Sequence, residues 1–223
     1  MKENTISLND YGKSAFFNKV LAIFGLAILA TGLGVYVGFN YLLLTFIHNP
    51  AYMIGIFVTE LILIFTSRAW SKSVPLNYFL FSIFTFISGI TLVPLLASFA
   101  IEFNGYDIIY RSLFATTATF LAMGIIGYTS KRSFEGLGGF LFVSLISMLI
   151  VGLIGIFIPW GNTGEMLYSG FGVIIFAGYT LYDFNRLKYY PEDEYIMAAI
   201  QIYLNIFNLF TSILRLTGAI SRE

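Results

Sequence analysis

The segment Tyr195–Leu216 reads YIMAAIQIYLNIFNLFTSILRL and carries the clearest indication of how this chain folds. It is long enough to cross a bilayer core, which takes about 20 apolar residues. Its polar side chains recur at steps of four, three, four and three, so they share one face of an α-helix. This polar stripe consists of Gln201, Asn205, Asn208, Ser212 and Arg215. Because lipid cannot hydrogen-bond a row of amides, the helix must be enclosed by others, or its stripe must line water. The spacing fits both a ladder of interhelical hydrogen bonds and a hydrophilic path.

The composition excludes several classes of protein. Of the 223 residues, 58% are hydrophobic and 11% are charged, against about 25% charged residues in soluble proteins. Lys plus Arg equals Asp plus Glu, so no basic excess is available for a nucleic-acid backbone. The chain has no cysteine, which excludes disulfides, thiolate metal sites and cysteine nucleophiles.

Six further apolar runs precede Tyr195–Leu216. We expect an all-α polytopic membrane protein, a seven-transmembrane-helix bundle with the last helix central, as one transmembrane domain over residues 1–223. The connectors are too short for a separate soluble domain. The expected spans are 18–44, 51–66, 76–100, 108–128, 137–158, 166–187 and 195–216.

The basic residues predict the orientation in the membrane. Lys and Arg concentrate on one side of the predicted helices, and that side is expected to be cytoplasmic. The side expected to be cytoplasmic carries Lys2, Lys13, Lys19, Arg68, Lys72, Lys131, Arg132, Arg186 and Lys188, and the other side carries Arg111, Arg215 and Arg222. The N-terminus is therefore predicted to be cytoplasmic. No lipidation or organelle-retention signal is visible, so we expect a cell membrane, in a bacterium.

Two acidic residues, Glu60 and Asp183, lie within the spans. A charge at mid-membrane costs about 2.5–3.5 kcal/mol on insertion scales, so such groups usually face protein or water. Glu60 is interpreted as lining a water-filled cavity, joining a buried pair or making a structural bond. Asp183 either forms an interfacial salt bridge with Arg186 or faces the interior of the bundle.

A second group of charges lies at the predicted cytoplasmic ends of the helices. Arg68 and Lys72 close the second span and are typical of positive-inside anchors. Glu192, Asp193 and Glu194 precede the last helix, where carboxylates favour the helix dipole. The same acidic cluster would also gather cations at a cytoplasmic mouth.

Catalytic motifs are missing from the sequence. The single histidine, His48, lies in a short connector, and there is no HExxH, GxSxG or Walker A sequence. We therefore expect neither an enzyme nor an ATP-driven pump. No cofactor is expected apart from a transported or bound ion.

Three segments resemble the Bax inhibitor-1 family, also called the transmembrane Bax inhibitor motif family. They are SGITLVP at Ser88–Pro94, GYTLYD at Gly178–Asp183 and IYLNIFNLFTSILR at Ile202–Arg215. The resemblance covers essentially the whole chain and indicates a bacterial-type member. It implies a central last helix and a passive, pH-modulated calcium leak, gated by two aspartates that a basic residue latches.

The resemblance places the gate on particular residues. Asp183 takes the position of the first aspartate, and Asn205 takes that of the second. An Asp–Asn pair has one titrating group, so it lacks the coupled titration of two carboxylates. Its oxygens still suit calcium, which takes oxygen ligands. Asp183 lies nearer the cytoplasmic end of its span than Asn205 does, so the sequence leaves their contact open.

Other family positions are also matched. Glu60 corresponds to the family's acidic residue in the second helix. The latch position falls on Ser71, with Lys72 beside it and Arg68 one turn earlier; these three are the candidate latch.

The sequence supports three hypotheses for function. The first is a passive calcium leak, in which the lipid bilayer and calcium are the partners. The second is a membrane-embedded regulator or inhibitor of a membrane protease or stress-response complex, with a membrane protein as partner. The third is a proton-coupled transporter of a small solute, which the absence of visible repeats disfavours.

Overall fold

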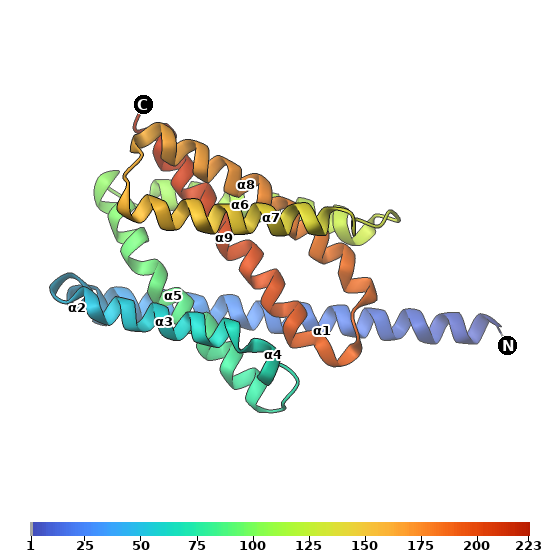
Figure 1. Ribbon diagram of the computed structural model, residues 1–223. Helices are drawn as coiled ribbons and strands as arrows, with labels where there is room; N and C mark the ends of the chain where they lie inside the picture. The colour runs from blue at the N-terminus through green and yellow to red at the C-terminus, as the bar shows by residue number, and fades with distance from the viewer. Residues whose placement is uncertain (1) are drawn as a thin grey trace. The chain divides into compact units, whose positions relative to one another are not determined.

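The computed structural model describes the backbone of residues 2–223 and the side chains of residues 12–155 and 157–223. Within this part the chain is helical and contains no strand (Figure 1). The side chain of Lys2, counted above among the basic residues, lies outside the described residues.

The helices follow one another with short connections. Two 3₁₀ turns, Leu187–Tyr189 and Glu192–Glu194, separate the last two helices, and a π-helical turn, Gly38–Leu42, joins the first two. The helices are α1 Lys2–Val37, α2 Leu43–His48, α3 Pro50–Phe65, α4 Ser67–Trp70, α5 Leu76–Glu102, α6 Asp107–Thr129, α7 Leu137–Phe157, α8 Gly161–Arg186 and α9 Tyr195–Ser221.

Five of the seven expected spans are confirmed as helical segments long and apolar enough to cross a membrane. They are Gly12–His48, Leu76–Glu102, Asp107–Thr129, Leu137–Gly155 and Glu192–Ser221. The second expected span is α3, whose 16 residues extend about 24 Å at 1.5 Å per residue, less than a typical core of about 30 Å. The sixth is α8, which has 26 residues but contains many polar residues and glycines.

The chain divides into two compact units. The first unit contains Met1–Ser98 and Tyr189–Tyr203, and the second contains Phe99–Lys188 and Leu204–Glu223. Helices α5 and α9 each contribute residues to both units. The expectation of one transmembrane domain stays a prediction.

Glycines bring α1 and α5 into backbone contact in the first unit. A Cβ atom on Gly89 would collide with the carbonyl group of Thr31, and one on Gly34 would collide with that of Phe86. Small residues allow such close approach between helices in membranes.

In the second unit, α6 and α7 both pack against α8 (Figure 1). The candidate span Glu192–Ser221, which contains α9, is the most enclosed of the five. Of its most apolar 18-residue stretch, 61% is buried, against 17–50% for the other four spans. This burial supports the interpretation that the last helix is surrounded by protein.

Candidate functional site

The polar stripe of α9 meets α8 along an antiparallel seam in the second unit. Asp183 contacts Asn205, and Glu165 contacts Arg215. Between these contacts, Gly172 lies so close to Ser212 that a Cβ atom would come within 2.6 Å of the Ser212 hydroxyl. Residue numbers rise along α8 as they fall along α9. We call this set of contacts the α8–α9 seam.

The pair Asp183–Asn205 forms one end of the seam. The Nδ2 group of Asn205 donates a hydrogen bond to Oδ2 of Asp183 over 2.7 Å. Both side chains are buried, with 6% and 5% of their surface exposed. The structure therefore answers the question that the sequence left open, because the two residues are in contact.

The electrostatics of this pair are those of one buried charge beside a neutral amide. Asp183 makes no ion pair within 4 Å among the described residues, and the guanidinium of Arg186 lies over the ring of Tyr182 instead. A buried carboxylate is costly unless it is hydrogen-bonded, and the amide supplies that bond. The pair contains a single titratable group.

Calcium is the ion that the sequence assigned to Asp183 and Asn205. Calcium takes about six to eight oxygen ligands, whereas this pair offers one carboxylate and one amide oxygen. Asn205 presents its NH₂ group to Asp183, so the amide would have to turn for both residues to ligate one ion. Among the side chains that the structure describes, no group of three or more His, Asp or Glu residues is arranged so that it could hold a metal ion. A calcium ion here would take its remaining ligands from water or the backbone.

The other members of the polar stripe also have protein partners. Arg215 forms an ion pair with Glu165 at 3.0 Å. Asn208 donates to the carbonyl group of Leu204, one turn earlier on α9, over 2.8 Å. In the first unit, Gln201 accepts a short hydrogen bond from the hydroxyl of Tyr190. The contacts of Asn205 and Arg215 join α9 to α8, whereas those of Asn208 and Gln201 do not, so the stripe forms part of the expected ladder between helices.

Glu60 lies on α3 in the first unit and is held by two hydroxyl groups of α5. Ser88 donates to one carboxylate oxygen over 2.5 Å, and Thr91 donates to the other over 3.0 Å. Both donors belong to the segment SGITLVP and lie three residues apart, on one helical face. Sequence reasoning quoted this segment but missed its role as the partner of Glu60.

The candidate latch residues have different surroundings in the first unit. Lys72 forms ion pairs with Asp193 at 2.8 Å and with Glu194 at 3.1 Å. The hydrogen bonds to these carboxylates raise the pKa of Lys72. Ser71 is buried and its carbonyl group accepts from Asn77.

Arg68 and Glu192, from the same predicted cytoplasmic groups, form no ion pair among the described residues. Both are exposed, and Glu192 lies in the 3₁₀ turn before α9. The structure thus joins Lys72 to the acidic cluster. The latch between this region and Asp183 stays a prediction.

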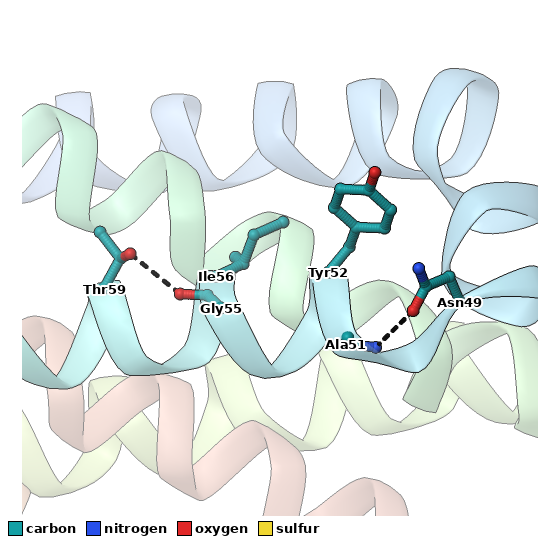
Figure 2. A pocket seen from close by; sticks show the side chains of 6 residues that line it. All are labelled: Asn49, Ala51, Tyr52, Gly55, Ile56 and Thr59. Atoms are coloured by element: carbon teal, nitrogen blue, oxygen red, sulfur yellow. Dashed lines mark hydrogen bonds between the residues drawn. The ribbon is translucent and has the colours of Figure 1, made fainter.

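A pocket of about 400 Å³ lies along α3, lined by Asn49, Ala51, Tyr52, Gly55, Ile56 and Thr59 (Figure 2). Figure 2 shows that Thr59 donates to the Gly55 carbonyl group and that Asn49 accepts from the backbone of Ala51. These two polar side chains are engaged by their own helix. None of the predicted site residues lines the pocket.

Comparisons with known proteins agree with this architecture. Residues 13–222 match the family model described as inhibitor of apoptosis-promoting Bax1. The chain is 34% identical to Bax inhibitor 1 of Schizosaccharomyces pombe, with 99% of this chain and 84% of the relative aligned. It is 34% identical to the Golgi anti-apoptotic protein of vaccinia virus strain Lister, over 92% and 85% of the two chains. It is 28% identical to mouse protein lifeguard 4, over 95% and 87%.

The fold and the seam define a multi-pass integral membrane protein built from helices. With a family model that matches nearly the whole length, the chain belongs to the Bax inhibitor-1 family.

Proposed function

We propose that this protein is a passive, calcium-permeable leak of the cell membrane, gated at Asp183 and Asn205. It crosses the membrane with seven helices and has a cytoplasmic N-terminus. One observation carries the proposal: the buried Asp183 carboxylate has a neutral amide, and no cation within 4 Å, as its partner.

The strength of this contact suits a gate. A hydrogen bond to a charged group contributes about 1.5–3 kcal/mol, whereas breaking a buried ion pair costs about 3–5 kcal/mol. An arriving cation would replace one amide hydrogen bond and gain the full charge of the carboxylate. The free-energy difference between the closed contact and an ion-binding state is therefore small. Any pH response of this gate follows one titration.

Calcium flux tests the proposal directly. Purified protein is reconstituted into vesicles loaded with a calcium-sensitive dye, and influx is compared for wild type, Asp183→Ala and Glu60→Ala. We expect the flux to fall toward background in Asp183→Ala and to change in Glu60→Ala. Asp107→Asn, which removes an exposed carboxylate at the start of α6, controls for net charge and should behave as wild type. Background flux in every sample would refute the leak.

A second candidate is a membrane-embedded regulator of a protein complex. The partnered polar stripe supports it, because a seam filled with internal contacts has no need of water. The viral relative is named anti-apoptotic, and the yeast relative is named a Bax inhibitor. Crosslinking in native membranes followed by affinity capture tests it. Recovery of no stable partner would count against regulation.

A further inference from the structure

The other end of the α8–α9 seam carries an ion pair. Nη1 of Arg215 lies 3.0 Å from Oε1 of Glu165. The second oxygen of Glu165 accepts a long hydrogen bond of 3.4 Å from the indole of Trp160, whose ring packs on Tyr168 with centroids 5.3 Å apart. Both oxygens of the Glu165 carboxylate are thus oriented. The pair is partly exposed at the surface of the protein: 43% of the Arg215 side chain and 22% of the Glu165 side chain is exposed.

This ion pair lies on the same face of α9 as the Asp183–Asn205 contact. Arg215 belongs to the same helical stripe as Asn205 and follows it by ten residues, about 15 Å along the axis of α9. The close contact of Gly172 with Ser212 lies between them. A cation that enters the seam from the end of α8 where Glu165 lies therefore meets Arg215 before it reaches Asp183.

The charge of Arg215 has a predictable effect on such a cation. The guanidinium group of Arg215 carries a positive charge, so it repels a divalent cation. The carboxylate of Glu165 offsets this charge at a distance of 3.0 Å. Charges that line an entrance change the local ion concentration by factors of roughly 10 or more.

We propose that the Glu165–Arg215 pair is a second, charge-compensated barrier in series with the Asp183–Asn205 gate and sets the rate at which cations enter the seam. This inference rests on the proposed leak function. It assigns a rate-setting role to two residues that the family resemblance does not include in the gate.

The proposal predicts changes of opposite sign for the two partners. Arg215→Gln leaves a carboxylate at the entrance, so calcium flux should rise by roughly threefold or more. Glu165→Gln leaves an uncompensated guanidinium, so flux should fall by a similar factor. A pair that served only to hold the helices together would respond in the same direction to both substitutions.

The experiment measures calcium influx into dye-loaded vesicles for both single variants and for the charge-reversed pair Glu165→Arg with Arg215→Glu. The charge-reversed pair keeps the attraction and should return flux toward wild type, and it covers the case in which a single variant folds poorly. Arg111→Gln is the matched control, because Arg111 forms an exposed ion pair with Asp107 within α6.

Opposite shifts in the two single variants, beyond the change in Arg111→Gln, support the proposal. Shifts of the same sign, or none beyond the control, overturn the barrier. If Asp183→Ala still reduces the flux toward background in that case, the proposed leak function stands. Background flux in wild type overturns both the leak and the barrier.

Discussion

The amide of Asn205 on α9 donates a 2.7 Å hydrogen bond to the buried carboxylate of Asp183 on α8. The contact joins a residue that titrates to one that does not. It also joins the last two helices at the residue positions where the family resemblance placed a gate.

The energy of the Asp183–Asn205 contact is measurable with a double-mutant cycle. Asn205→Ala leaves the buried carboxylate without its donor and should reduce the free energy of unfolding by about 1–3 kcal/mol. Adding Asp183→Ala should recover part of this loss, which gives a coupling energy of the same size. Unfolding in mixed micelles by titration with SDS provides the free energies. Strictly additive losses would show that the two side chains do not interact in the membrane protein.

The hydroxyl groups around Glu60 should stabilise the first unit. Ser88→Ala and Thr91→Val each remove a donor to the carboxylate, and each should lower the free energy of unfolding by about 1.5–3 kcal/mol. Ser98→Ala is the control, because Ser98 bonds only to a carbonyl group of its own helix and is exposed. Equal effects of Ser88→Ala and Ser98→Ala would argue against the bond to Glu60.

The contact of Gly172 with Ser212 should tolerate no added methyl group. Gly172→Ala places a Cβ atom 2.6 Å from the Ser212 hydroxyl and 3.0 Å from the end of Met148. Such overpacking costs about 1–3 kcal/mol. At Gly25, where a Cβ atom meets nothing within 4 Å, the same substitution should stabilise the helix by about 0.5–1 kcal/mol. The thermal midpoints of the two variants in detergent should therefore move apart, and a joint rise would contradict the close seam.

The ion pairs of Lys72 predict a pH dependence of stability. The hydrogen bonds to Asp193 and Glu194 raise the pKa of Lys72, so the folded state holds the proton more tightly than the unfolded state does. This contribution is complete below the ordinary lysine pKa of about 10.4 and is lost as the pH rises through the raised value. The difference in melting temperature between wild type and Lys72→Gln should vanish over that alkaline range.

Added salt should also reduce this difference, because the side chain of Lys72 is 53% exposed and exposed pairs are screened. Lys131→Gln is the control, since Lys131 is exposed and forms no ion pair among the described residues. A difference for Lys72→Gln that persisted at high pH and high salt would exclude an electrostatic origin.

Much of the helical architecture is predictable from the sequence, because apolar runs bounded by charges report on membrane spans. The polar stripe predicted a last helix that is enclosed by others or lines water, and the high burial of α9 favours enclosure. What one sequence does not contain is the register between helices. The contact of Asp183 with Asn205 depends on how far α8 is shifted along α9, and the pairing of Glu165 with Arg215 depends on the same shift.

The partners of Glu60 were missed for a related reason. Ser88 and Thr91 are ordinary residues of a membrane helix, and their hydroxyl groups often bond to their own backbone, as both do here. Only the packing of α3 against α5 shows that they also reach a carboxylate. The ion pairs of Lys72 with the acidic cluster depend in the same way on two connectors that are distant in sequence.

The pH profile of calcium flux tests the single-carboxylate gate most directly. In dye-loaded vesicles, wild-type flux should follow a one-proton titration, and Asp183→Asn should remove the pH response. Asn205→Asp places two carboxylates side by side, so its profile should become a coupled titration of two protons. A two-proton profile in wild type, or a pH response that survives Asp183→Asn, would contradict the account.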